Sequence, residues 1–486
     1  MNNLVKTLIN RMSKISGTTL TDRHMDILNF AYNYYEKNRV GPLYQNIKKN
    51  TGATKEKIEE LFPHGLASVY TWVGIPIQTG RDLCKPMATV HVEDHREVYF
   101  DHNATSFIRD EVKKSLMGYY GGSSGFGNPS SSTNPGKISY DIIRHSRIQI
   151  SDCLKVGPEE IVFTGSGSEA NNAAIKGIAF KHYAEKGHII SSKVEHPSVL
   201  KALEYLEGLG FEVTYLDISK NGRVTAQSVK DNLKDNTILV TIMAVNNEIG
   251  TINPISEIGE ICKSAGVPFM VDGIQGFGKI KLLPRKMGIS LMTMSGHKIY
   301  APKGVGALYV NKEISIVPLI HGGEQEYGLR AGTENIGSIL AFGLAAKLAN
   351  SEMEKENKRL LELRGYFLEG LRKIEPGVIV NGSLEHRTAN NLNIGFPDID
   401  SGSLLLSLNQ IGVYVSSGSA CSAGSKDASY TIKALGVDTD RYGIIRFSFG
   451  LPNTREDVEY LFKYLPTILE QLKAESAGDS NRVGPS

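Results

Sequence analysis

Cysteine is scarce in this 486-residue chain, and its scarcity excludes two architectures. The cysteines are Cys84, Cys153, Cys262 and Cys421. They are too few and too far apart in sequence for a disulfide framework or a zinc ribbon. We therefore expect no metal site, and a cysteine that carries chemistry should act alone.

Long apolar runs and net charge are missing as well. No apolar run reaches the roughly 18 to 20 residues that a membrane-spanning helix needs. The amino-terminal segment MNNLVKTLINRMSK lacks the apolar stretch and cleavage site of a secretory signal, so we expect a cytoplasmic protein without membrane contact. The 54 Lys and Arg residues balance 52 Asp and Glu residues to +2, which predicts no field strong enough to gather nucleic acid.

The composition is that of an ordinary globular protein, with 41% hydrophobic and 22% charged residues. At roughly 150 residues per domain, the length suggests about three units. Composition breaks near 85–97 and 474 mark their limits. The predicted organisation is a helical module (1–84), a linker (85–97), a large domain (98–350), a small α+β domain (351–474) and a disordered tail (475–486), with about 98–111 a candidate for packing with the small domain.

Short strand-like runs alternate with helical patterns between Glu159 and Val310. This alternation predicts an α/β domain whose mainly parallel sheet is covered on both faces. The expected strands are centred on 161–163, 189–190, 213–215, 238–240, 269–271, 291–293 and 307–309.

Two charged residues follow buried runs of this sheet. Lys298, in Ser-Gly-His-Lys, comes just after the apolar run 289–292, where α/β sheets bind ligands and a desolvated amine can form a Schiff base. Asp272 closes another run, and such a carboxylate can keep the pyridine nitrogen of pyridoxal phosphate protonated. Each residue alone would more often be a solvated loop lysine or a turn residue.

Three further features fit the same pocket. The turn Thr-Gly-Ser-Gly-Ser-Glu at 164–169 precedes an expected helix and could hold a phosphate, although it matches neither the P-loop nor the dinucleotide fingerprint. His196 could stack on a flat ring and move protons, and Asn247 could donate to a phenolic oxygen. In isolation, His196 would be a structural loop histidine and Asn247 a turn residue. Together with Lys298, Asp272 and the turn at 164–169, they favour a pocket.

A second kind of chemistry is predicted in the segment Ser-Ser-Gly-Ser-Ala-Cys at 416–421. Cys421 stands among small residues, as suits a nucleophile on an exposed loop. Cys153 and Cys262 lie inside helical patterns and read as core residues. Downstream, the planar fork of Arg446 suits a substrate carboxylate, with a surface ion pair as the alternative.

With these residues in view, 96–474 resembles the cysteine desulfurases of the NifS/IscS type, which have the class V aminotransferase fold. Several motifs occur in the family's order: Phe-Gly-Asn-Pro-Ser at 126–130, the phosphate turn, 245–250, Asp272 with Gln275, 295–298, Arg-Ala-Gly-Thr at 330–333, and 416–421. The resemblance implies a pyridoxal-phosphate-dependent transferase of fold type I, with a seven-stranded sheet in the large domain.

The resemblance also implies the cofactor site of a homodimer. Lys298 would form the Schiff base and Asp272 would pair with the pyridine nitrogen, while His196 would stack on the ring. The phenolic oxygen would be contacted by Asn247 and Gln275, and the phosphate by Gly167, Ser168, Ser295, His297 and, from the other subunit, Thr333.

For the substrate, the resemblance implies that Arg446 binds the carboxylate of L-cysteine. Cys421 would take the sulfur as a persulfide and leave L-alanine, with Lys298 and His196 in the proton transfers. The sulfur would pass to an acceptor for iron–sulfur clusters, tRNA thiolation or related trafficking. A selenocysteine lyase and an aminotransferase of the same fold are the alternatives.

Residues 20–84 resemble the DsrC/TusE sulfur-carrier family. The resemblance rests on the Asp-Ile-Leu-Asn-Phe-Ala-Tyr-Asn-Tyr-Tyr helix at 26–35, Val-Gly-Pro at 40–42, Glu-Leu-Phe-Pro-His-Gly at 60–65, and Gly-Ile-Pro at 74–76 followed by Cys84. It implies that Cys84 accepts sulfur from Cys421. The alternatives are a docking module with an incidental cysteine and a nucleic-acid-binding helix-turn-helix, which the acidic residues Glu56, Glu59 and Glu60 disfavour.

Overall fold

The computed structural model describes residues 3–480, apart from 39–40, 76–87, 89, 91, 93–95, 123–124 and 419–428. The chain forms two compact units. One comprises Met1–Glu97, Gly402–Val413 and Tyr464–Ser486, and the other comprises Val98–Ser401 and Tyr414–Lys463. No helix in the part that is described has the length and apolar character needed to cross a membrane.

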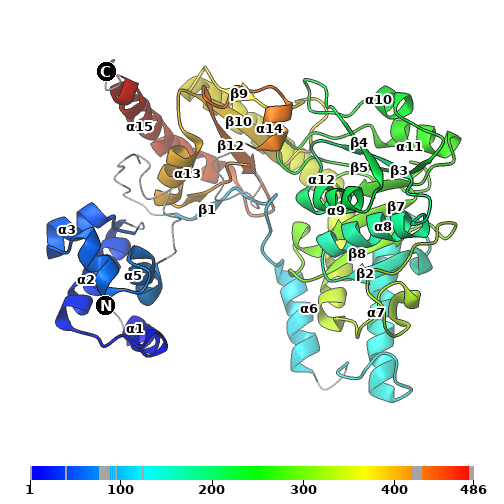
Figure 1. The fold of residues 1–486 in the computed structure, drawn as a ribbon, viewed down its shortest axis with the longest axis horizontal. Helices are drawn as coiled ribbons and strands as arrows, with labels where there is room; N and C mark the ends of the chain where they lie inside the picture. Colours follow the sequence, from blue (N-terminus) through cyan, green and yellow to red (C-terminus); the bar gives the residue numbers. More distant parts are fainter. Residues whose placement is uncertain are drawn as a thin grey trace. The chain divides into compact units, whose positions relative to one another are not determined.

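The amino-terminal segment is helical, as predicted (Figure 1). Its side chains enclose an apolar core that includes Phe62, Tyr70 and Trp72. Thr54 caps one helix by accepting a hydrogen bond from the Lys57 N–H at 3.3 Å. The helices are α1 (Asn3–Ser16), α2 (Asp22–Asn38), α3 (Tyr44–Thr51), α4 (Lys55–Leu61) and α5 (Leu66–Val73).

Ala88, a described residue of the segment predicted as a linker, is 1% exposed. Its N–H donates to Ser407 Oγ at 3.0 Å. Ser407 belongs to α13 (Ser401–Gln410). The connecting segment is therefore attached to this helix at one point.

The large sheet has seven strands in the order β2-β8-β7-β6-β5-β3-β4. All neighbours are parallel except the pairs that β8 makes with β2 and β7, which confirms the predicted mainly parallel sheet. The strands coincide with the seven predicted runs: β2 (Ile161–Thr164), β3 (His188–Ser192), β4 (Glu212–Leu216), β5 (Thr237–Met243), β6 (Phe269–Asp272), β7 (Leu291–Ser295) and β8 (Gly306–Val310).

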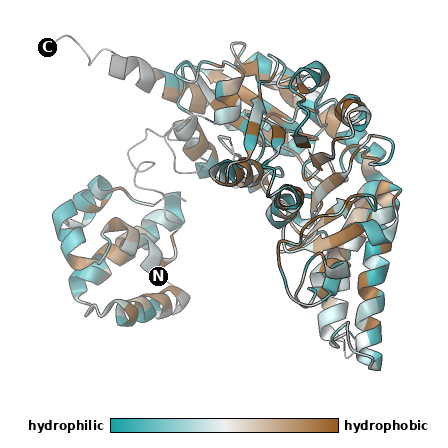
Figure 2. Ribbon diagram, turned by 45° about the vertical axis from the view of Figure 1, so that its right-hand side comes forward, coloured by the Kyte–Doolittle hydropathy of each residue, from teal (hydrophilic) through white to brown (hydrophobic). Residues whose placement is uncertain are grey.

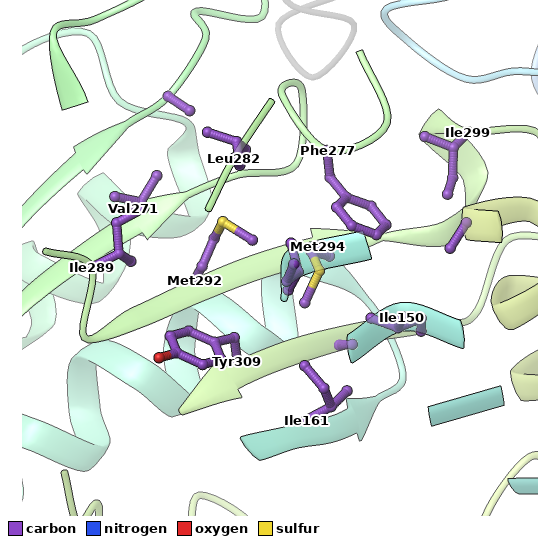
Figure 3. Packing of buried hydrophobic residues seen from close by; sticks show 14 of the residues in the cluster. Ile150, Ile161, Val271, Phe277, Leu282, Ile289, Met292, Met294, Ile299 and Tyr309 are labelled. Atoms are coloured by element: carbon purple, nitrogen blue, oxygen red, sulfur yellow. The ribbon is translucent and has the colours of Figure 1, made fainter. Parts of the chain in front are cut away.

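Successive residues of a strand enter different cores on the two faces of this sheet. Met292 and Met294 pack in one core with Phe277 and Tyr309 (Figure 3), whereas Leu291 packs in the other. This alternation follows from the two-residue period of a strand. Because both faces are covered, central strands are rich in buried apolar residues, and β5 (Thr-Ile-Leu-Val-Thr-Ile-Met) is buried throughout. Brown segments, which mark hydrophobic residues, are seen in strands of the ribbon (Figure 2).

Helices supply the two covers. The first core includes residues of α7 (Asn134–Leu154), α11 (Ile255–Ser264) and α12 (Ile336–Ile374), and the second includes residues of α8 (Gly167–Lys181) and α9 (Pro197–Gly208). The remaining helices of this region are α6 (Asp110–Gly121) and α10 (Ala226–Asp231).

Helix α12 is continuous over 39 residues and spans the predicted domain limit at 350. Phe342 near its start lies in the core of the large sheet, and Phe367 near its end stacks with Phe447 and Phe449. Between them, Glu352 makes a two-point ion pair with Arg109 at 2.7 and 2.8 Å.

The second sheet has the order β12-β10-β9, and its strands are antiparallel. Its strands are β9 (Ile379–Val380), β10 (Asn391–Pro397) and β12 (Tyr442–Ser448), and a separate pair joins β1 (Val98–Tyr99) to β11 (Val413–Tyr414). The last helices are α14 (Tyr430–Ala434) and α15 (Arg455–Ser480). Helix α15 extends six residues into the segment predicted to be a disordered tail.

Candidate active site

Four strands of the large sheet end at one cavity of about 360 Å³. Asp272 is the last residue of β6 and Ser295 the last of β7, whereas His196 and Asn247 follow β3 and β5. All four residues line the cavity. It lies where the carboxyl ends of parallel strands place a ligand site.

Asp272 is held by two hydrogen bonds. The Asn171 amide donates to its Oδ2 at 2.9 Å, and the Ile274 N–H donates to its Oδ1 at 3.0 Å. Asn171 is itself oriented by the Thr293 hydroxyl, which donates to its Oδ1 at 2.7 Å. A buried carboxylate with this support is a fixed anion that can face a cationic ligand group.

His196 joins the same set of contacts through Ser198. The Ser198 N–H donates to Nδ1 of His196 at 3.1 Å, so this ring nitrogen is an acceptor and a neutral ring carries its proton on Nε2. Burial lowers the pKa of His196, although the charge of Asp272 opposes the shift. The ring is therefore neutral near pH 7, and its Nε2–H is the group that can donate.

The Lys298 ammonium points at the backbone after β1. Its Nζ donates to the carbonyl oxygens of Asn103 at 2.6 Å and Ala104 at 2.7 Å. The Gln275 amide donates to the same Asn103 oxygen at 2.8 Å. Lys298 and Gln275 therefore meet at one carbonyl beside the cavity that both line.

The turn after β2 leads into the amino terminus of helix α8. Ser166 caps α8 by accepting a hydrogen bond from the Glu169 N–H at 3.1 Å. At Gly167 a Cβ would lie 2.4 Å from Ile274 Cδ1, so a larger residue would require the Ile274 side chain to shift. The first N–H groups of α8 and the hydroxyl of Ser168 stand at the cavity, which suits an anion such as a phosphate.

His297 lies near this turn and is electrically neutral. Its Nδ1 is 3.1 Å from the Thr105 hydroxyl. Burial, with a contribution from the charge of Lys298, lowers the pKa of His297 to about 4. A neutral imidazole can donate one hydrogen bond to an anion without competing with the cationic groups around it.

Arg446 is 1% exposed and lines the cavity from β12. Its guanidinium donates to the Asn247 carbonyl at 3.0 Å and pairs with Asp101 at 2.5 Å. Among the described residues, Nε of Arg446 and Oδ1 of Asn247 have no hydrogen-bond partner although both are buried. A buried polar atom without a partner is costly, so this corner is suited to a polar ligand.

Most of the predicted pocket residues share this cavity: Gly167, Ser168, His196, Asn247, Asp272, Gln275, Ser295, His297, Lys298 and Arg446. Thr333 is exposed and is not among the residues that line it. Cys84 and Cys421 lie outside the described residues. Cys153 and Cys262 are in helices, and burial raises the pKa of their thiols to about 11 and about 12, as expected for unreactive core cysteines.

Some residues that line the cavity, and one that pairs with Arg446, were not predicted from the sequence. Asn103, Ala104 and Lys303 line the cavity, and Asp101 pairs with the arginine there. Asn103 and Ala104 could have been predicted, because Asp-His-Asn-Ala-Thr at 101–105 is a polar segment directly after the strand-like run 98–100.

Comparisons with known proteins agree with this geometry. Residues 98–461 match the family "Aminotransferase class-V", and residues 1–76 match "DsrC like protein". The cysteine desulfurase IscS of Methanosarcina thermophila is 44% identical over 381 residues, which cover 78% of this chain and 94% of the relative. The chain belongs to the IscS-type cysteine desulfurases. The resemblance stated from the sequence is thereby confirmed, and the DsrC-like module precedes the desulfurase part.

Three further comparisons support the assignment of this desulfurase. A putative cysteine desulfurase IscS 1 of Bacillus subtilis is 42% identical, with 77% of this chain and 99% of the relative covered. A solved NifS-like protein has 34% identity and a TM-score of 0.73, and covers 78% of this chain and all of its own. A structure described as SspA in complex with cysteine has 35% identity and a TM-score of 0.65, with 72% and 98% covered.

Pyridoxal 5'-phosphate is the cofactor of this family, and the chemistry of the cavity fits it. A lysine amine suits the aldehyde, a fixed carboxylate suits the pyridinium nitrogen, and the amino terminus of α8 suits the phosphate. Cysteine desulfurase activity and the predicted cofactor are thus both supported by family and by site.

Proposed function

We propose that this desulfurase removes sulfur from L-cysteine, releases L-alanine and carries the sulfur as a persulfide on Cys421. The observation that carries the proposal is the cavity in which Lys298, Asp272, His196 and Arg446 meet. Bound pyridoxal phosphate supplies an electron sink for the bond to be broken at the substrate. The residues supply attachment, charge and proton transfer.

Each cofactor contact is proposed from its place in the cavity. Lys298 would bond covalently to the cofactor, and Asp272 would pair with its ring nitrogen. His196 would stack on the ring, while Asn247 and Gln275 would donate to the phenolic oxygen. The phosphate would be held by Gly167, Ser168, Ser295 and His297 at the amino terminus of α8.

Arg446 would bind the substrate carboxylate. Its Nε has no partner among the described residues, and the guanidinium is held by Asp101 and by the Asn247 carbonyl. A planar fork fixed in this way can make parallel hydrogen bonds to a carboxylate. Lys298 and His196 would take part in the proton transfers of the reaction.

The described residues on both sides of Cys421 support its access to the substrate. On one side, Ser416 exchanges backbone hydrogen bonds with Arg446 at 2.6 and 3.3 Å. On the other side, the Ser429 hydroxyl donates to Glu248, and the Tyr430 hydroxyl donates to the carbonyl of Glu195, the residue before His196. The five residues from Ser416 to Cys421 span at most about 18 Å, which limits the distance of Cys421 from Ser416.

The working form would be a homodimer in which Thr333 contributes to the phosphate site of the partner. Thr333 is exposed, and it follows Arg330, whose guanidinium pairs with Glu169 of α8 at 2.9 Å. We further propose that sulfur passes to an acceptor protein. The cytoplasmic location inferred from the sequence stays a prediction.

Cys84 would be the first acceptor. The DsrC-like match ends at residue 76, eight residues before it. Incubation with L-cysteine followed by persulfide mapping by mass spectrometry tests both thiols. The wild type should carry extra sulfur on Cys421 and Cys84, Cys421→Ala on neither, and Cys84→Ala on Cys421 only.

The same experiment has outcomes that contradict the proposals. Full turnover of L-cysteine by Cys421→Ser would favour an aminotransferase reaction, in which no cysteine takes the sulfur and no alanine forms. Sulfur on Cys84 in Cys421→Ala, or its absence there in the wild type, would refute the relay. Steeply salt-dependent nucleic-acid binding would favour a helix-turn-helix role for the module.

A further inference from the structure

A second lysine stands next to the cavity and is used by none of the contacts above. Lys279 is partly buried in the segment after β6, and its Nζ donates to Gln275 Oε1 at 2.9 Å. It also approaches Asn103 Oδ1 at 3.5 Å. Lys279 and Lys298 both line a separate cavity of about 60 Å³. Lys279 is not among the residues that line the larger one.

The contacts of Gln275 fix which way its amide faces. The oxygen of the amide, which can only accept, takes a hydrogen bond from Lys279 Nζ. The nitrogen donates to the Asn103 carbonyl, which can only accept. A flipped amide would face a donor with its nitrogen and an acceptor with its oxygen, so Lys279 helps to hold one orientation.

This orientation leaves a donor for a ligand. An amide nitrogen carries two hydrogens, and the Asn103 carbonyl takes one of them. Gln275 lines the large cavity, so its second N–H is available to an acceptor bound there. Without Lys279, Oε1 would lose its cationic donor, and the amide would be freer to rotate.

Several charged and titratable groups surround Lys279. The charges of Lys298 and Arg446 lower the pKa of Lys279, and the charge of Lys279 lowers the pKa of His102 and of His297. Arg109, Glu352 and Glu356 line the small cavity with it. Desolvation, with the charges of Lys298 and Arg446, lowers the pKa of Lys279 to about 7.

We propose that Lys279 is a positioning residue, which holds Gln275 as a hydrogen-bond donor to the phenolic oxygen of the cofactor. The inference rests on the proposed contact between Gln275 and that oxygen. A hydrogen bond donated to the phenolic oxygen stabilises the negative charge of that oxygen. The oxygen then holds less tightly the proton on the nitrogen that joins Lys298 to the cofactor. Loss of Lys279 should therefore raise the pH at which that proton leaves.

The test is a pH titration of the absorption band of the purified, cofactor-loaded protein without substrate. In Lys279→Met the midpoint should rise by about one pH unit, a tenfold change in proton affinity. Lys279→Arg, which restores a cationic donor, should return at least half of the shift. Lys281→Met, two residues away and exposed, should titrate like the wild type.

A double variant separates positioning from a general charge effect. If Lys279 acts through Gln275, Lys279→Met added to Gln275→Ala should move the midpoint little further. An unchanged midpoint in Lys279→Met, or full additivity in the double variant, would overturn the inference. If Lys279→Met does not fold, Lys279→Ala, which also lacks a donor, is to be titrated under the same criteria.

The proposed function can fail separately. In the wild type, borohydride treatment followed by mass spectrometry should find the cofactor attached at Lys298. Attachment at another lysine would refute the assignment of Lys298. An unchanged midpoint in Lys279→Met beside normal attachment at Lys298 would refute only the positioning role.

Discussion

At the scale of single residues, Arg446 combines burial with incomplete hydrogen bonding. The guanidinium donates hydrogen bonds to Asp101 and to the Asn247 carbonyl, whereas Nε has no partner among the residues described. Such a guanidinium is oriented before a ligand arrives. Much of the entropy of ordering it is therefore lost on folding and not on binding.

Arg446→Lys should raise KM for L-cysteine about 10- to 100-fold, because an ammonium cannot reproduce the two parallel hydrogen bonds of the fork. Affinity for pyridoxal phosphate should change less than threefold. Steady-state alanine production and cofactor titration measure the two quantities. Arg441→Lys, just before β12, is the matched control, and equal KM values for the two variants would contradict the role.

His102 makes stability depend on pH. It is 3% exposed, both ring nitrogens lack a partner among the described residues, and burial lowers its pKa to about 3. Between that value and the unfolded pKa of about 6.5, the unfolded state binds more protons. Stability is therefore lost as the pH falls below about 6.5, by about 2 kcal/mol at pH 5 from His102 alone.

His102→Phe should reduce this acid sensitivity. The phenyl ring keeps an aromatic contact with Tyr99, Phe107 and Tyr300 but has no proton to bind. Denaturant melts at pH 7.5 and pH 5 should show a smaller difference than in the wild type, by about 2 kcal/mol. A difference equal to that of the wild type would assign the acid sensitivity to other groups.

At the scale of elements, the amino terminus of α8 serves both the fold and the site. Ser166→Ala removes the cap and should cost about 1 kcal/mol of stability. It should also weaken cofactor affinity several-fold, because Ser166 lines the cavity. Thr225→Ala removes the equivalent cap of α10, where the Ser228 N–H donates to Thr225 at 3.0 Å, and should cost stability only. Thermal melts and cofactor titration distinguish the two, and equal cofactor affinities would contradict the role of the turn.

Elements were predictable where their pattern is local. Both faces of the large sheet are buried, so each strand is a short apolar run between helical patterns, and all seven runs are strands. The predicted limit at 350 falls inside α12, since no glycine or proline interrupts that helix there.

The site was predictable where motifs mark it and not where tertiary contacts make it. Lys298 and Asp272 stand at strand ends that the sequence shows. Asn103 lies nearly 200 residues from Lys298, and only the fold brings its carbonyl to that lysine. Lys279 carried a local signal, its spacing of four residues from Gln275, which is the distance of one helical turn.

At the scale of the whole molecule, the desulfurase part is expected to work without the DsrC-like module. The curated relatives are covered over 94% to 99% of their length by 77% to 78% of this chain, so they have desulfurase parts of this size. A chain that begins at Lys85 keeps Ala88, which is buried and donates to Ser407. With dithiothreitol as sulfur acceptor, its rate of alanine production should be within twofold of the full chain.

A tenfold loss of that rate would contradict the independence of the desulfurase part. Transfer of labelled sulfur to a protein acceptor is the second measurement. If the module is the carrier, this transfer should fall in the shortened chain while alanine production persists. Equal transfer by both chains would refute the carrier role.

Helix α12 makes the second sheet sensitive to small changes far from it. Its 39 residues extend about 58 Å, from the core of the large sheet to the aromatic cluster around Phe367 and Phe447. A rod of that length that tilts by one degree moves its far end by about 1 Å. Phe447 adjoins Arg446 in β12, so a tilt of the helix would shift the residue that we propose binds the substrate carboxylate.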